Sequence, residues 1–145
     1  MRGPKENARC LDRLSKIIER YQPDTLVMEN CSERGSRRSP RIRRLYQATE
    51  TVARSQTIDV FRYSRRQVRQ CFEKMGATTK HEIAQAISQL IPALSHRMPP
   101  IRKPWMSEDS RMSLFDAASL AWSFYFRDAG FQGEMNQSID EYGRM

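Results

Sequence analysis

Apolar residues recur at three- and four-residue intervals in several stretches of the chain, a spacing that places them on one face of a helix. Together with capping signals, this pattern predicts helices over residues 5–21, 40–55, 64–75, 79–91 and 108–127. The chain is therefore expected to be mainly helical.

Polar residues mark where three of these helices begin. Ser64 with Gln67, and Thr79 with Glu82, have the spacing of capping boxes, which satisfy the free backbone N–H groups of a first turn. Ser107 is expected to cap the last helix. The acidic residues that follow it would then complement the positive end of the helix dipole.

Two shorter stretches have the composition of strands. Residues 24–29 and 57–63 are rich in apolar, β-branched and aromatic residues. The order strand, helix, strand predicts a βαβ unit with parallel strands. A parallel sheet of two strands is rarely stable alone. We therefore expect either that another chain completes the sheet or that strands of the fold are missing from this sequence.

The remaining segments are expected to be irregular. Residues 95–107 contain three prolines and are predicted to form a loop. Residues 130–145 are polar and contain three glycines, so they are predicted to form a weakly ordered tail. The expected organisation is one domain over residues 1–129, followed by the tail 130–145.

The composition narrows the classes of partner. The 145 residues carry a formal net charge of +8, and the sequence pI is near 9.9. This balance favours polyanions, nucleic acid first and an anionic membrane surface second, although a well-solvated surface has the same composition. No segment has the ~18–20 apolar residues of a membrane span, and the N-terminus lacks the apolar core of a signal peptide. We expect no membrane partner.

The cysteines and histidines disfavour two further classes of site. Cys10, Cys31 and Cys71 are widely spaced and odd in number. This pattern suits a reducing, cytoplasmic location rather than a disulfide framework. His81 and His96 are too few and too scattered to favour a Cys/His zinc site.

Two acidic residues stand in apolar surroundings. Glu29 ends a predicted strand, and Asp116 lies within LFDAASLAW. Asp109 precedes Asp116 by two helical turns and so falls on nearly the same face. Neighbouring carboxylates repel, by about 4 kcal/mol at 4 Å and an effective dielectric near 20, and Mg²⁺ or Mn²⁺ relieves this repulsion. The pattern favours a metal site. The alternative is that Glu29 forms a salt bridge with an arginine.

A cluster of arginines follows the first predicted strand. Its members are Arg34, Arg37, Arg38, Arg41, Arg43 and Arg44. Arginines at this density, among glycine and serine, favour binding to nucleic-acid phosphates. A solvated loop is the alternative.

Three segments together resemble the RuvC-type Holliday junction resolvases of the ribonuclease H-like superfamily. LVMEN resembles the strand that ends in the second acidic residue of that family, and FDAASLAW resembles its C-terminal helix, where an aspartate–alanine pair carries the last metal ligand. FRYSRRQVRQCFEKMGATTKHEIAQAI resembles the region between them. The matching residues of that region are Tyr63, Val68, Arg69, Gly76, Ala77 and Lys80. The resemblance covers about residues 8–126.

The resemblance implies a fold and an activity. The fold would be α/β, with a ribonuclease H-like mixed sheet and flanking helices. The activity would be Mg²⁺-dependent cleavage of branched DNA, usually by a homodimer. Glu29 and Asp116 would bind the metal, and Lys80 would contact the phosphate near the scissile bond. Arg69 and the arginine cluster would contact DNA.

The chain departs from the family in two places. The family begins with a strand that bears an essential aspartate, followed by two more strands, and no apolar strand with an aspartate precedes residue 24. The three N-terminal strands are therefore expected to be absent, through truncation or in a natural short form. The family often has another acid one turn before the aspartate–alanine pair, where this chain has Ser113; Glu108 or Asp109 could substitute.

These departures leave alternatives open. The first hypothesis is a metal-dependent, structure-selective DNA endonuclease. Because the first aspartate, a bridging metal ligand, is missing, this hypothesis allows that residues 1–145 alone are inactive. The second is a non-catalytic nucleic-acid-binding module of the same fold. A third, ranked lower, is a protein-interaction role for the aromatic segment AWSFYF, although core packing is the simpler explanation for these residues.

Overall fold

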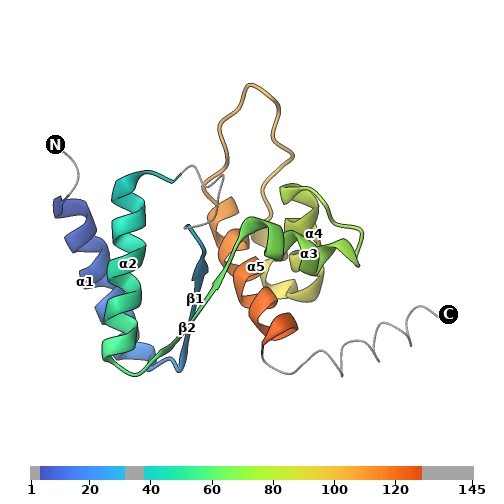
Figure 1. Ribbon diagram of the computed structural model, residues 1–145. Helices are drawn as coiled ribbons and strands as arrows, with labels where there is room; N and C mark the ends of the chain where they lie inside the picture. Colours follow the sequence, from blue (N-terminus) through green and yellow to red (C-terminus); the bar gives the residue numbers. More distant parts are fainter. Residues whose placement is uncertain (1–3, 32–37, 129–145) are drawn as a thin grey trace. The chain divides into compact units, whose positions relative to one another are not determined.

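The computed structural model contains five α-helices, one 3₁₀ helix and two strands in the residues that it describes, 4–31 and 38–128 (Figure 1). The predicted mixed α/β class is confirmed at this level, with helix predominating over a small parallel sheet. The chain divides into two units, residues 1–64 and 65–145, and each is described by itself. The predicted tail, 130–145, lies outside the described residues.

The first unit consists of an N-terminal helix followed in sequence by a βαβ arrangement. Its elements are α1 (Pro4–Tyr21), β1 (Thr25–Glu29), α2 (Pro40–Ser55) and β2 (Asp59–Tyr63). The strands pair in parallel, in a register that runs from Thr25 opposite Asp59 to Glu29 opposite Tyr63. The predicted parallel pairing is therefore confirmed.

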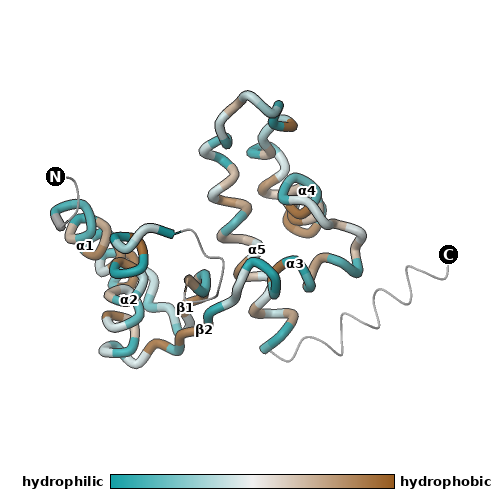
Figure 2. The backbone as a smooth tube through the Cα atoms, turned by 45° about the horizontal axis from the view of Figure 1, so that its top comes forward, coloured by the Kyte–Doolittle hydropathy of each residue, from teal (hydrophilic) through white to brown (hydrophobic). Residues whose placement is uncertain are grey.

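Helix α2 begins as the sequence indicates. Ser39 accepts a hydrogen bond from the backbone N–H of Ile42 through its Oγ (3.3 Å), and Pro40 stands in the first turn, where a missing N–H costs nothing. Ile18, Ala53 and Ile58 are buried together, with partly buried Leu14, Leu26, Val52 and Val60 packed against them. This core joins the apolar faces of α1 and α2 to the strands. Figure 2 shows the alternation of apolar and polar bands along these helices.

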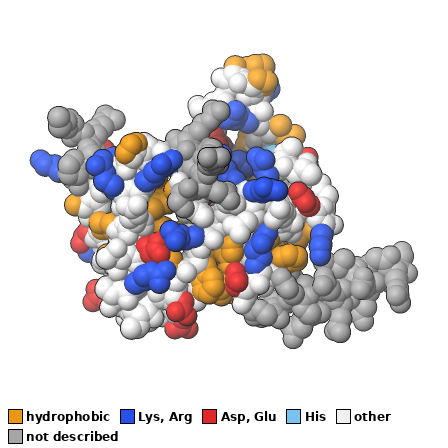
Figure 3. Space-filling view, in the orientation of Figure 1, with side chains coloured by type: hydrophobic (Ala, Val, Ile, Leu, Met, Phe, Trp, Pro, Cys, Tyr) orange, Lys and Arg blue, Asp and Glu red, His pale blue; other side chains and the backbone are white. Residues whose placement is uncertain are grey.

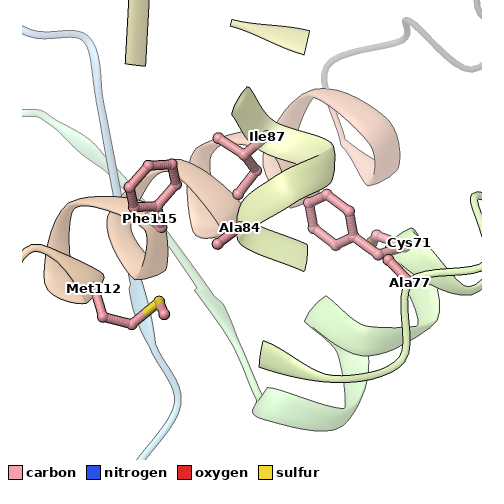
Figure 4. Packing of buried hydrophobic residues seen from close by; sticks show 7 residues of the cluster. Cys71, Ala77, Ala84, Ile87, Met112 and Phe115 are labelled. Carbon is pink, nitrogen blue, oxygen red and sulfur yellow. The ribbon is translucent and has the colours of Figure 1, made fainter. Parts of the chain in front are cut away.

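The second unit is helical. Its elements are α3 (Arg65–Glu73), α4 (Lys80–Leu90), the 3₁₀ helix η1 (Pro92–Arg97) and α5 (Met112–Arg127). Phe72 and Phe115 are almost fully buried, and Ala84 and Ile87 of α4 lie between α3 and α5 in the same cluster (Figure 4). This packing fixes α4 against α5.

The turn between α3 and α4 has the predicted signals. Gly76 has φ +73°, in the left-handed region that favours glycine, and so ends the path of α3. Thr79 caps α4 by accepting from the backbone N–H of Glu82 (3.2 Å). The Glu82 carboxylate accepts in return from the backbone N–H of Thr78 (3.1 Å), one residue before the position in a standard capping box.

Two predicted boundaries are wrong. The last helix begins at Met112 instead of residue 108, so Ser107 does not cap it. The helix starts where burial starts, because Met112 and Phe115 are its first core residues. The predicted 95–107 loop also begins too early, since η1 extends to Arg97.

The three cysteines are free thiols in different environments. Cys10 is exposed on α1, whereas Cys31 and Cys71 are buried. Arg127, in the last turn of α5, donates from Nε to the Cys71 sulfur (3.3 Å) and from Nη2 to the Gln67 carbonyl oxygen (3.2 Å). Cys71 therefore belongs to the structural core of the second unit.

Candidate functional site

Lys80 and Asp116 are two site residues predicted from different parts of the sequence, and the structure brings them together. Lys80 is the first residue of α4, held there by the Thr79 cap, and Asp116 lies in the second turn of α5, directly after buried Phe115. The Lys80 Nζ lies 3.2 Å from Oδ2 of Asp116. The packing of α4 against α5 thus creates this contact.

Glu108 completes the group, and the three residues are called the Lys80 cluster below. The Lys80 Nζ lies 2.6 Å from Oε1 of Glu108. All three side chains are about half-exposed. Water screens such pairs, so each ion pair contributes less than about 1 kcal/mol to folding. The cluster is open to solvent and to a ligand.

Asp109 is engaged elsewhere. Its Oδ1 accepts from the backbone N–H and from Nε of Arg111, both at 2.9 Å, and its Oδ2 accepts from Nη2 at 2.7 Å. The side-chain and backbone hydrogen bonds from Arg111 lower the pKa of Asp109 to about 2. The argument that placed Asp109 on the same helical face as Asp116 fails, because Asp109 precedes the start of α5.

Glu29 ends β1 and pairs with an arginine. Its Oε2 accepts from Arg38 Nη2 (2.8 Å) and Nε (3.2 Å), and only 15% of its side chain is exposed. The hydrogen bond with Glu29 raises the pKa of Arg38. The salt bridge that the sequence left open as an alternative is therefore present. Partial burial makes the pairing favourable, since an unpaired carboxylate there would be costly.

Glu29 and Asp116 belong to different units. Glu29 lies in the first unit and Asp116 in the second, and each unit is described by itself. That Asp116 faces Glu29 across a single site stays a prediction.

The DNA-binding candidates divide into three groups. Arg34 and Arg37 lie outside the described residues. Arg41 is held by an ion pair with Glu6 (3.3 Å) and a hydrogen bond to the side-chain oxygen of Asn7 (3.1 Å). The exposed candidates are Arg38, Arg43 and Arg44 in the first unit and Arg69 and Lys80 in the second. Figure 3 shows Lys and Arg side chains scattered over the visible face, with fewer acidic ones among them.

Each unit contains carboxylates that could bind a metal ion. Glu29, Glu108 and Asp116 supply carboxylate oxygens, the donor type that Mg²⁺ prefers. Within residues 4–31 and 38–128, however, no group of three or more His, Cys, Asp or Glu side chains is placed to hold a metal ion. The Lys80 ammonium instead provides the positive charge between two carboxylates. The carboxylate oxygens are of the type that Mg²⁺ prefers, but the described residues of either unit alone provide too few ligands to hold an ion.

Two features of the described residues, one in each unit, were not predicted from the sequence. Glu50 of α2 is 15% exposed and binds Arg54 of its own helix (2.9 Å) and Arg62 of β2 (3.3 Å). Its i, i+4 spacing to Arg54 was the available signal. Trp105 is the second feature, because it is highly exposed although its segment was read only as a proline-rich loop.

Comparisons with protein-family models, curated proteins and solved structures give no match. In the part of the chain that the structure describes, no helix is both long and apolar enough to cross a bilayer.

Proposed function

We propose that this protein is a RuvC-type, metal-dependent endonuclease that acts on branched DNA, with a fold related to ribonuclease H. One observation carries the proposal. The resemblance selects Lys80 as a phosphate-binding residue and Asp116 as a metal ligand from separate motifs, and the two side chains lie 3.2 Å apart. Residues that act at one scissile phosphate are expected to lie near one another, and this contact supports the proposal.

The chain's own residues would prepare this site. Lys80 holds the Asp116 carboxylate in place and, being half-exposed, can also reach a phosphate oxygen. Arg38 orients Glu29 in the same way at the end of β1. The resemblance implies that Glu29 and Asp116 are each ligands of Mg²⁺ or Mn²⁺. A bound ion would activate water and stabilise the leaving oxygen of a phosphodiester.

A cleavage assay tests this function. Four-way junction and linear duplex of equal length are incubated with the protein and Mg²⁺, Mn²⁺ or a chelator. Because the resemblance implies a further aspartate on an earlier strand, residues 1–145 are compared with protein translated from the whole reading frame. We expect metal-dependent nicking that prefers the junction and is lost in Glu29→Gln. Glu19→Gln, an exposed change on α1, is the matched control. Absence of metal-dependent cleavage in both proteins would rule out the proposal.

A non-catalytic nucleic-acid-binding protein is the second candidate. The observation that favours it is that basic side chains neutralise both proposed ligands, Glu29 through Arg38 and Asp116 through Lys80. It predicts junction binding that weakens steeply with salt, and no cleavage with any metal.

A homodimer is part of the proposal. The sheet of the described residues has two strands, fewer than a parallel sheet normally needs. Strand addition from a second copy would extend it. Light scattering after size exclusion should give twice the mass of the 17.0 kDa chain. A single species of monomer mass at high concentration would contradict this expectation.

A further inference from the structure

The segment between η1 and α5 carries apolar side chains that point into solvent. Its residues 98–107 are called the 98–107 loop below and form part of the extension that projects from the helices of the second unit (Figure 1). Trp105 is 79% exposed, Ile101 72% and Met106 46%. A tryptophan is rarely left in water without a partner.

A turn presents Trp105. The backbone N–H of Met106 donates to the Lys103 carbonyl oxygen (3.0 Å), which closes a β-turn with Pro104 and Trp105 at its centre. Proline restricts the backbone at the first central position of such a turn. The Lys103 Nζ lies 5.4 Å from the centroid of the Trp105 ring, within the range of a cation–π interaction. The indole is thus both exposed and held in place.

The base of the 98–107 loop is anchored in the core of the second unit. Pro99 is fully buried, and Met98 packs against the core cluster of the second unit. Ser88 of α4 donates from its hydroxyl to the Met98 sulfur (3.5 Å). The exposed Trp105 therefore lies on a turn whose preceding residues are packed in the core.

The charge around Trp105 is positive. Arg97, Arg102 and Lys103 are basic, and no acidic residue occurs between 97 and 107. The two acids that follow are already paired, Glu108 with Lys80 and Asp109 with Arg111. At this end of the unit, Figure 3 shows hydrophobic side chains at the tip with basic ones next to them.

We propose that the 98–107 loop binds unpaired nucleotides, with a base stacked on Trp105 and the flanking phosphates bound by Arg102 and Lys103. An exposed aromatic ring beside cations is the combination that binds single strands without reading their sequence. The positive charge favours a polyanion over a neutral protein surface. The three exposed apolar side chains of the loop, Ile101, Trp105 and Met106, form a patch too small for stable membrane insertion. This inference rests on the proposed function, because forks and flaps, which are branched DNA, carry unpaired nucleotides next to the branch.

Binding measurements test the inference without requiring cleavage. The full chain is titrated with a 15-nucleotide oligothymidine and with a fully paired duplex of equal length, in the absence of divalent metal. We expect Trp105→Ala to weaken oligothymidine binding by about fivefold or more, as for loss of a stacked base, and Trp105→Phe to retain most of it. Affinity for the duplex should stay within about twofold, since phosphate contacts dominate there.

Tyr21→Ala is the matched control. Tyr21 is 67% exposed and lies under the Arg20 guanidinium at 5.3 Å, so it has the same chemistry in the first unit. Its loss should leave oligothymidine affinity unchanged. Trp105→Ala that changes neither affinity, or weakens both equally, would overturn the inference. So would Trp105-dependent binding to phosphatidylserine vesicles without single-strand binding, or a Trp105-dependent change in oligomeric mass.

The inference and the proposed function can fail separately. Trp105-dependent oligothymidine binding in a protein without nuclease activity would support single-strand binding by the 98–107 loop and contradict the proposed endonuclease function. If a Trp105→Ala protein cleaves junctions with metal and binds oligothymidine normally, single-strand binding by the 98–107 loop is contradicted and the endonuclease function is supported.

Discussion

The Lys80 Nζ lies 3.2 Å from the Asp116 carboxylate, although the two residues come from different helices of the second unit. The contact depends on the burial of Ala84 and Ile87 on α4 and of Phe115 on α5, because these residues pack the helices together. The Thr79 cap fixes the first turn of α4, from which Lys80 projects.

Asp116→Asn should separate activity from stability. The change keeps the size of a side chain that is about half-exposed, so the free energy of unfolding should change by less than about 1 kcal/mol. Removing the groups that orient a metal ligand costs about 10–100-fold in activity, so removing a ligand should cost at least that in junction nicking. Asp109→Asn is the control, since Asp109 pairs with Arg111. Equal losses in both variants would contradict the assignment of Asp116.

Glu29 and Arg38 should be energetically coupled. The pair is partly buried and has two hydrogen bonds, so a double-mutant cycle with Glu29→Gln and Arg38→Gln should give about 1 kcal/mol of coupling. The cycle is measured by urea unfolding followed by circular dichroism. The exposed pair of Lys16 and Asp12, one helical turn apart on α1, should give about 0.3–0.5 kcal/mol. A Glu29–Arg38 coupling no larger than this would show that burial adds nothing.

Arg44 should contribute to nucleic-acid affinity through charge. Arg44 is exposed on α2, so Arg44→Ala should weaken duplex binding and lower the slope of log affinity against log salt by about 1. Arg54 of the same helix is already paired with Glu50, so Arg54→Ala should change the slope less. Binding is measured by fluorescence anisotropy between about 50 and 200 mM salt, where affinities that depend on phosphate contacts fall steeply. Equal changes of slope would argue against a phosphate contact at Arg44.

The ionisation of Asp109 should depend on Arg111. The pKa of Asp109 is lowered from 3.8 to about 2 by hydrogen bonds from Arg111, so the folded state favours the ionised carboxylate. The stabilisation from this pair is complete above the ordinary pKa and is lost as pH falls toward 2. In Arg111→Gln, carboxyl NMR should show the Asp109 pKa moving upward, though incompletely, because the backbone N–H bond remains. An unchanged pKa would contradict the assigned cause.

The Thr79 cap should stabilise the second unit. Thr79→Ala removes the acceptor for the Glu82 backbone N–H and should cost about 1 kcal/mol of unfolding free energy. Thr78→Ala keeps the backbone N–H that Glu82 binds and should cost less than about 0.5 kcal/mol. Urea unfolding followed by tryptophan fluorescence compares the two. A larger cost at Thr78 would reverse the assignment of the cap.

The sequence predicted most of the elements because their signals are local. Helical spacing located α1 and α2, and the Thr79 and Glu82 pair marked the start of α4. The start of α5 was wrong because Glu108 and Asp109 resemble a first turn. In the structure, Glu108 pairs with Lys80 and Asp109 with Arg111 before the helix begins.

The candidate site was less predictable because it depends on tertiary contacts. The sequence could propose an arginine partner for Glu29, but only the fold selects Arg38. The contact between Lys80 and Asp116 arises from packing of α4 on α5, which residue spacing along one helix does not contain. Trp105 was overlooked because exposure, and not spacing, distinguishes it.

The different environments of the three thiols have a practical consequence. Because Cys10 is exposed and both other cysteines are buried, a maleimide dye should attach to α1 of the native protein without any cysteine replacement. Both tryptophans, Trp105 and Trp122, lie in the second unit. One singly labelled sample therefore carries an extrinsic reporter on the first unit and intrinsic reporters on the second, so the two units can be observed independently during a single titration.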